Sequence, residues 1–290
     1  MMKKRFAKKS LGQNFLQSTE IRDRIIASAG NITGKNILEI GPGLGFLTSK
    51  ILEKKANLTA VEFDPRAVEI LKRDFGHKEN FHLVQGDILD QDLDSLRFSN
   101  PGIKDAQIPG LEFPYAIVAN IPYNITAPIL RKILEKTKHK PQFAILMVQK
   151  EVAQKISPPS LDPGIKDPQI PGLKFKRSIL SIAVEVFSEC KILFQVPRIC
   201  FSPSPKVDSA VIRLDIRPEP LVPEDLLKDF FTVVNAGFSE KRKKLSNSLG
   251  KFFGTDSTLL LGSIDGNRRP ETLTIDEWKQ VTHNFQAHAK

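Results

Sequence analysis

A glycine-rich turn constrains the fold of this chain more than any other segment does. The stretch NILEIGPGLGFLTSKILEKKA, residues 36–56, opens with a short apolar run that predicts a buried strand and ends in a pattern typical of a helix. Between the two lies the turn Gly41–Gly45. Glycines here let the backbone approach a ligand closely and direct free N–H groups at it. By itself the pattern could serve a dinucleotide, a nucleoside or only a tight turn.

Strands and helices alternate along most of the chain. Apolar runs predict strands within five segments, the last of which continues into a helix: 36–40, 57–64, 81–89, 115–123 and 143–156. Helical spacing predicts helices over 20–30, 46–54 and 65–75. This order indicates an α/β fold with a parallel, doubly wound sheet. Further strands are expected over 179–187, 190–194 and 207–216.

The character of the chain changes at Pro218. PEPLVPED is a proline-rich hinge, and residues 224–290 predict several helices. We therefore expect an α/β domain over residues 1–217 and a small all-α domain over residues 218–290.

Two carboxylates follow the glycine turn at the ends of the next two strands. Glu62 stands where a carboxylate can accept both hydroxyls of a ribose. A dinucleotide-binding G-x-G-x-x-G turn would need glycine at position 46, where this chain has Phe46. The form G-x-G-x-G, preceded by Glu39, is more typical of an S-adenosylmethionine site. Asp87 ends the third strand, where proteins of that class read the adenine amino group. All these groups would meet at the carboxyl edge of one parallel sheet.

The fourth strand ends in the most specific motif of the chain, Asn120-Ile121-Pro122-Tyr123. Methyl transfer to an exocyclic amine is difficult because the nitrogen lone pair is conjugated with the ring. Acceptors on the amine protons favour a tetrahedral nitrogen, and the Asn120 side-chain oxygen and the Ile121 carbonyl could supply them. Pro122 fixes the turn. Tyr123 offers an aromatic face on which an extruded base can stack.

Two loops complete this candidate site. Gln13–Leu16 precedes the first helix and can close over the methionine end of the cofactor. Phe201 opens the proline-rich loop FSPSPKVDS, residues 201–209, and could stack on the other face of the base. Lys206 in that loop could equally contact phosphate or serve structure.

The formal net charge of +10 is concentrated in two segments. Residues 1–35 hold eight Lys and Arg against two acids, and residues 131–177 hold eleven against four. Such segments suggest a polyanionic partner, but the charge alone does not choose between nucleic acid, a membrane surface and chance, since a basic cluster can be simply a solvated face.

Several functional classes lack their sequence signatures. Cys190 and Cys200 form no CxxC pair, and HExxH is absent, so we expect no metal site. The sequence has no apolar run near the length of a membrane span and no signal-like segment behind its basic start. We expect a cytoplasmic protein that is not bound to a membrane.

A thirteen-residue element occurs twice. PGIKDAQIPGLEF, residues 101–113, recurs as PGIKDPQIPGLKF, residues 163–175, with eleven identical positions. Two copies do not make a repeat architecture. We interpret them as inserts in surface loops, with a pair of substrate-binding loops as the alternative.

Taken together, these motifs resemble the KsgA family of ribosomal RNA adenine dimethyltransferases over nearly the whole chain. The stretches that carry the resemblance are KKSLGQNFL (8–16), ILEIGPGLGFLT (37–48), VEFD (61–64), GDIL (86–89), NIPYNIT (120–126), LMVQKEVAQKI (146–156), FSPSPKVDSAV (201–211), GFSEKRKKLSNSL (237–249) and RRPETLTIDEW (268–278). Two features depart from the family pattern: the PGIKD inserts, and Asn124, which stands where the family often has a second aromatic residue.

The resemblance implies a Rossmann-like class I methyltransferase fold with a helical C-terminal domain that binds rRNA. It implies transfer of four methyl groups from S-adenosylmethionine to two adjacent adenosines in the 3′-terminal hairpin loop of 16S rRNA, in the small subunit or its precursor during ribosome biogenesis. Nothing in the sequence suggests an obligate oligomer, so we expect a monomer. It implies that the target base is contacted by Asn120, Tyr123 and Phe201, with Ile121 and Pro122 in the same catalytic motif. It carries cofactor contacts to Asn14, Leu16, Gly41, Glu62, Asp87 and Asn120, beside Gly43 and Gly45 of the glycine turn.

Two alternatives remain open. One is an adenine methyltransferase that acts on large-subunit rRNA, against which the 201–209 loop and the C-terminal stretch argue. The other is a non-catalytic RNA-binding assembly factor with the same fold, against which the intact glycine turn and the Asn120–Tyr123 motif argue.

Overall fold

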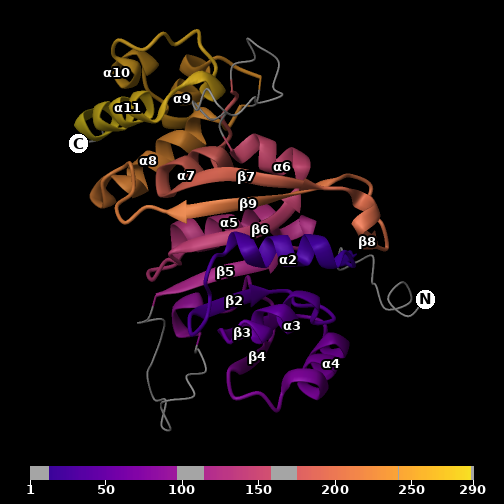
Figure 1. Cartoon of the computed structure of the whole chain (residues 1–290). Coiled ribbons are helices and arrows are strands. Elements are labelled where there is room, and N and C mark those ends of the chain that lie inside the picture. The colour runs from indigo at the N-terminus through magenta and orange to yellow at the C-terminus, as the bar shows by residue number, and fades with distance from the viewer. Residues whose placement is uncertain (1–12, 97–113, 158–174, 241, 289–290) are drawn as a thin grey trace. The chain divides into compact units, whose positions relative to one another are not determined.

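The computed structural model describes residues 13–96, 114–157, 175–240 and 242–288. Its main element is a seven-stranded sheet of order β4-β3-β2-β5-β6-β9-β7 (Figure 1). Neighbours from β4 to β6 run parallel, and β9 runs antiparallel to β6. The strands are β2 (Asn36–Ile40), β3 (Asn57–Glu62), β4 (Phe81–Gln85), β5 (Tyr115–Asn120), β6 (Phe143–Gln149), β7 (Ser188–Val196) and β9 (Ser209–Ile216).

The central strands are apolar because both faces of the sheet are covered. All but the first residue of β2 and all but the last of β6 are buried. The register pairs Ile40 with Val61 and Glu62 with Gln85, so β2, β3 and β4 end at one edge. The loops that follow these strands therefore begin side by side.

Helices connect the parallel strands. The Ser18 side chain caps α2, and Asp64 caps α4, whose first residue is Pro65. The helices of this part are α2 (Thr19–Ser28), α3 (Phe46–Glu53), α4 (Pro65–Phe75), α5 (Thr126–Arg131) and α6 (Lys150–Ile156). Short elements are β1 (Phe15–Leu16), β8 (Phe201–Ser202) and the single helical turns η2 (Leu93–Ser95), η3 (Tyr123–Ile125), η4 (Lys132–Lys136) and η5 (Arg198–Cys200). The predicted alternation is thus confirmed, with element ends shifted by a few residues.

The strand predicted over residues 179–187 is wrong, because Ile179–Phe187 form helix α7. Ser178 and Ser181 build a capping box that starts this helix. Seven of its nine residues are apolar, and a short run of this kind predicts a strand as readily as a buried helix. The other two predictions are confirmed, since 190–194 lies within β7 and 207–216 contains β9.

The chain forms two compact units. The first holds the sheet and contains the described residues up to Gln154 together with Glu189–Ile216. The second contains the described residues of Lys155–Ser188 and those from Arg217 onward. These units are defined by compactness alone and not by function. The division into an α/β domain over residues 1–217 and a helical domain over residues 218–290 therefore stays a prediction.

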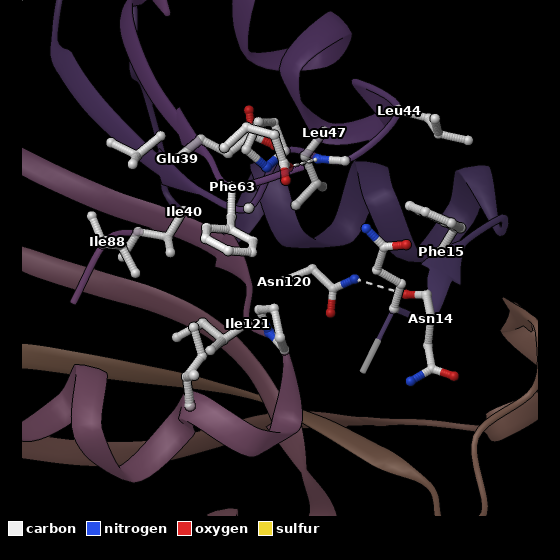
Figure 2. Close-up of a pocket in the computed structure, with 18 of the residues that line it drawn as sticks. Asn14, Phe15, Glu39, Ile40, Leu44, Leu47, Phe63, Ile88, Asn120 and Ile121 are labelled. Carbon is white, nitrogen blue, oxygen red and sulfur yellow. Dashed lines mark hydrogen bonds between the residues drawn. The ribbon is translucent and has the colours of Figure 1, made fainter. Parts of the chain in front are cut away.

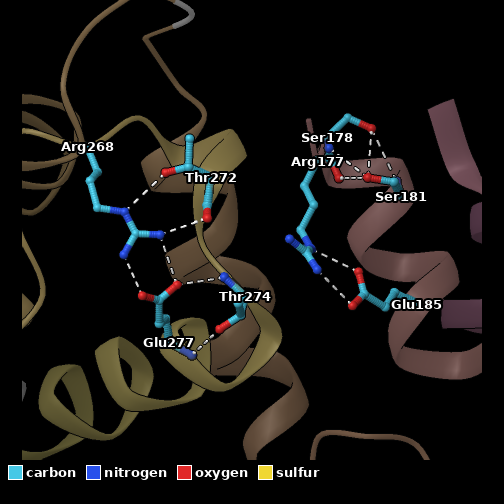
Figure 3. A network of polar contacts seen from close by, with 8 residues as sticks. All are labelled: Arg177, Ser178, Ser181, Glu185, Arg268, Thr272, Thr274 and Glu277. Atoms are coloured by element: carbon cyan, nitrogen blue, oxygen red, sulfur yellow. Dashed lines mark hydrogen bonds and ion pairs between the residues drawn. The ribbon is translucent and has the colours of Figure 1, made fainter. Parts of the chain in front are cut away.

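The second unit is helical, as expected for the C-terminal part. Trp278 is fully buried, and a Cβ on Gly237 would lie 2.4 Å from its Cη2, so glycine allows this close approach. Two arginines, Arg177 and Arg268, each donate to both carboxylate oxygens of a glutamate, Glu185 and Glu277 (Figure 3). Beside α7 it contains α8 (Glu224–Gly237), α9 (Leu245–Phe253), α10 (Ser257–Leu261), the turn η6 (Pro270–Thr272) and α11 (Ile275–His288).

Some sequence predictions fall outside the described residues. These are the basic cluster at 3–9, the first copy of the repeated element and all but Phe175 of the second copy. Among the described residues, no helix is long and apolar enough to cross a membrane.

The turn Gly41–Gly45 needs glycine for its backbone conformation. Gly41, Gly43 and Gly45 have φ of 66°, 58° and 79°, a region that side chains disfavour. A Cβ on Gly45 would also lie 2.5 Å from Cε2 of Phe75 on α4. Gly45 therefore meets two constraints, one from the backbone and one from packing.

We predict that Gly45→Ala destabilises the protein more than Gly34→Ala. Gly34 has a similar φ of 68°, but a methyl group added there would have nothing within 4 Å, so it isolates the backbone cost of about 1–2 kcal/mol. Urea unfolding of both variants measures the difference. Equal losses of unfolding free energy in the two variants would contradict the prediction, because they would show that the Phe75 ring moves aside at no cost.

Candidate active site

A pocket opens at the carboxyl edge of the parallel strands (Figure 2). Its walls come from the loops after β2, β3, β4 and β5 and from the N-terminal segment Gln13–Leu16. Doubly wound sheets bind their ligands at this edge.

The carboxylate of Glu62, at the end of β3, is bound by two backbone N–H groups. Gly43 donates to Oε2 and Asp64 donates to Oε1, both at 2.8 Å. The residue is 5% exposed, and burial raises the pKa of its carboxyl above the usual value despite these two bonds. Because Gly43 lies in the glycine turn, Glu62 ties that turn to the end of the neighbouring strand.

Asp87 lies on the pocket wall after β4. Gly86 precedes it and donates its N–H to the Glu62 carbonyl at 2.9 Å. Oδ1 of Asp87 accepts from the Leu89 N–H at 2.9 Å, which fixes the side chain. Phe63, which is 56% exposed, and Ile88 add apolar surface to the same pocket (Figure 2). A carboxylate beside apolar side chains suits a purine with an amino group.

Glu39 is a buried acid within the glycine-turn motif. Thr48 Oγ1 donates to its Oε2 at 2.7 Å. Burial raises the pKa of the Glu39 carboxyl to about 8, and the nearby Glu62 adds to this rise. The Thr48 bond joins the end of β2 to α3 across the glycine turn.

Asn120 ends β5 with its carboxamide in the pocket wall. Its Nδ2 donates to the Asn14 carbonyl at 3.4 Å (Figure 2). In this bond the amide nitrogen contacts the N-terminal segment. Oδ1 takes no part in it and can therefore accept a hydrogen bond from a donor in the pocket. The Ile121 N–H donates to the Met147 carbonyl at 3.3 Å, which continues the strand pairing by one residue.

Tyr123 is held by a contact from β9. Its hydroxyl lies 2.6 Å from the hydroxyl of Ser209 at the start of that strand. Burial raises the pKa of the Tyr123 phenol, so the ring stays neutral at physiological pH. The ring therefore offers a fixed, uncharged aromatic surface.

The structure brings most of the predicted site residues to this one pocket. The lining includes Asn14, Leu16, Gly41, Gly43, Glu62, Asp87, Asn120, Ile121, Pro122 and Tyr123. Their individual roles stay predictions, because a shared pocket does not show which ligand atom each one contacts.

Two predicted residues do not line the pocket. Gly45 packs against α4, as described above. Phe201 is 5% exposed in the hydrophobic core, and β8 pairs it with Leu16 of β1. In this structure Phe201 supports the N-terminal segment and presents no open face for a base.

Sequence reasoning gave no individual role to several lining residues. Phe63 and Ile88 directly follow Glu62 and Asp87 in the sequence. This position next to a predicted site residue is the only sequence feature that indicates their place in the pocket. Gln13 and Phe15 belong to a predicted loop, but their partners are distant in sequence: Gln13 donates to Asp64 at 3.0 Å. No local pattern indicates that pairing.

The donor set fits S-adenosylmethionine. One pocket holds a glycine turn that admits close backbone approach, the carboxylates of Glu62 and Asp87, and the apolar ring of Phe63. Carboxylates suit ribose hydroxyls and an amino group, and an aromatic ring suits a purine. Fold and site together define a class I, S-adenosylmethionine-dependent methyltransferase.

Sequence comparison narrows this class. A family model described as ribosomal RNA adenine dimethylase matches residues 4–287. The chain belongs to this family. Ribosomal RNA small subunit methyltransferase A of Alkaliphilus oremlandii is 38% identical over 283 residues, which are 96% of this chain and 91% of that protein. The protein of the same name from Enterococcus faecalis is 36% identical over 287 residues, 96% of this chain and 90% of that one.

Solved structures show the same fold. A dimethyladenosine transferase from Plasmodium falciparum gives a TM-score of 0.67 at 23% identity, over 94% of this chain and 98% of that one. The 23S rRNA methyltransferase ErmE gives a TM-score of 0.63 at 25% identity, over 94% of this chain and 100% of that one.

We predict that Glu39→Gln flattens the pH dependence of stability. The pKa of Glu39 is raised from 4.5 to about 8 in the folded protein, so the folded state binds a proton that the unfolded state has lost between those values. The wild-type protein should therefore lose stability relative to the variant as the pH rises through that window. The free energy of unfolding in urea, measured at intervals of about one pH unit from acid to neutral and slightly basic pH, tests this prediction.

The matched control is Glu69→Gln on the exposed face of α4. It should change the pH slope of the unfolding free energy far less. A wild-type slope that Glu39→Gln leaves unaltered would contradict the prediction.

Proposed function

We propose that this chain dimethylates N6 of two adjacent adenosines in the 3′-terminal hairpin loop of 16S rRNA. The observation that carries the proposal is the Asn120–Tyr123 turn, which lines the same pocket as the glycine turn and the two acids. The relatives named as small subunit methyltransferases support this choice of rRNA.

In the proposed reaction, this chain acts mainly by positioning. S-Adenosylmethionine supplies the methyl group and leaves as S-adenosylhomocysteine, a neutral thioether that needs no acid. Oδ1 of Asn120 and the Ile121 carbonyl accept hydrogen bonds from the adenine amine and favour a nitrogen with an available lone pair. After attack, a backbone carbonyl or water takes the proton.

The proposed cofactor contacts follow the strand ends. Glu62 binds the ribose hydroxyls and Asp87 binds the adenine amino group. Gly41 and Gly43 allow the backbone to approach the cofactor, and Asn14 and Leu16 cover its methionine end. Gly45 supports the turn through packing.

Tyr123 stacks on the extruded target base in this proposal. The Ser209 contact holds its ring, so the base meets a surface that is already in place. Phe201 acts indirectly, through its pairing with Leu16.

We also propose that the substrate is the small subunit or its precursor, and that the protein acts as a cytoplasmic monomer. The basic segments would hold rRNA phosphates and make binding sensitive to salt. Among the described residues of segment 131–177, the lysines exposed enough for such a contact are Lys136, Lys138, Lys155 and Lys176.

Labelled-methyl transfer tests the proposal. The substrates are unmethylated small subunits, naked 16S rRNA and 23S rRNA. We expect transfer of four methyl groups per small subunit, located by primer extension at the two adjacent adenosines. Transfer to 23S rRNA alone would support the large-subunit alternative, and no transfer to any substrate would support the assembly-factor alternative.

We predict that Asn120→Ala abolishes methyl transfer while cofactor affinity falls far less. The reason is that Oδ1 acts on the target amine, whereas most proposed cofactor contacts lie elsewhere. Isothermal titration with S-adenosylhomocysteine and the labelled-methyl assay measure the two effects. Asn31→Ala, at an exposed position that does not line the pocket, is the control. Equal loss of activity and affinity would contradict the role of Asn120.

We predict that Tyr123→Phe retains most of the activity and Tyr123→Ala loses most of it. Phe keeps the aromatic face and loses only the Ser209 contact, while Ala removes the stacking surface, worth about 1–3 kcal/mol per base. The kcat and KM of both variants with small subunits measure this. Equal defects would assign the role to the hydroxyl instead of the ring.

A further inference from the structure

Two backbone contacts attach the segment Gln13–Leu16 to the rest of the first unit. At its end, Phe15 and Leu16 pair with β8 as a short antiparallel ladder. In its middle, the Asn14 carbonyl accepts from Nδ2 of Asn120. The second of these contacts holds the segment at the end of β5.

A third attachment lies on the ribose side of the pocket. Nε2 of Gln13 donates to Oδ2 of Asp64 at 3.0 Å. Asp64 is 1% exposed, and the Arg66 guanidinium holds the pKa of its carboxyl down at about 2, so this carboxylate is charged. A hydrogen bond to a charged acceptor is stronger than one between neutral groups. Gln13 therefore makes a strong link between segments that are far apart in sequence.

Asp64 connects directly to the proposed ribose-binding carboxylate. The Asp64 N–H donates to Oε1 of Glu62, whose Oε2 accepts from Gly43. A chain of hydrogen bonds through Asp64 and Glu62 thus joins the Gln13 side chain to the glycine turn. Both ends of this connection line the pocket.

We propose that Gln13 is a positioning residue: its bond to Asp64 holds the segment Gln13–Leu16 closed over the pocket and couples that closure to S-adenosylmethionine binding. The inference rests on the proposed function only for the identity of the cofactor. Gln13 itself needs no contact with the reacting atoms.

The test uses three variants of the full-length protein. Gln13→Ala removes the donor, and Gln13→Glu places a second carboxylate against Asp64. Gln13→Lys restores a donor with a charge opposite to that of Asp64. Gln280→Glu is the matched control, because Gln280 donates to a serine hydroxyl in the second unit. Circular dichroism and the melting temperature check that each variant is folded.

Two measurements are made without methyl transfer. Hydrogen–deuterium exchange of the protein without cofactor reports closure through the amides of residues 13–18, including the Gln17 N–H that donates to the Cys200 carbonyl at 2.8 Å. Titration with S-adenosylmethionine reports affinity. We expect faster exchange and about tenfold weaker binding for Gln13→Ala, a larger effect for Gln13→Glu, and recovery in Gln13→Lys. The control should match the wild-type protein.

Unchanged exchange and affinity in Gln13→Glu would overturn the proposal, and so would a Gln13→Lys variant as weak as Gln13→Glu. A failure of the proposed function looks different. In that case the wild-type protein transfers no methyl group to rRNA, while the Gln13 variants still change exchange and cofactor affinity.

Discussion

The buried carboxylate of Glu62 is the contact on which the site depends. It accepts the N–H of Gly43 from one loop and the N–H of Asp64 from another, at the edge where the parallel strands end. Each of these N–H groups would otherwise need another partner at a largely buried place. One side chain therefore joins the glycine turn to the chain after β3 and forms the side of the pocket where we propose that the ribose binds.

Much of this arrangement could be predicted from sequence, because its signals are local. A short apolar run, a glycine turn and an amphipathic helix predict one strand–helix unit, and parallel strands bring successive loops to one edge. That the pocket contains Glu62, Asp87 and Asn120 could be predicted from their positions at the ends of strands. The register of β2, β3 and β4 then brings these loops together.

Other features depend on tertiary contacts that no local pattern reveals. Six of the nine residues of helix α7 are buried, and a short, mostly apolar run does not distinguish a helix from a strand. Phe201 has the residue type expected for base stacking, but its pairing with Leu16 places it in the core. The contact between Gln13 and Asp64 joins residues 51 positions apart.

The carboxamide of Asn120 has two chemically different ends, and the fold uses them for different purposes. The nitrogen binds the N-terminal segment through the Asn14 carbonyl, and the oxygen points away from that bond (Figure 2). If the segment were withdrawn, the amide could rotate and present a donor where an acceptor is needed. In the proposed reaction, a nucleobase that arrived early would then meet a repelling N–H group. The role proposed for Asn120 therefore implies an order of assembly in which the segment binds first and the base second.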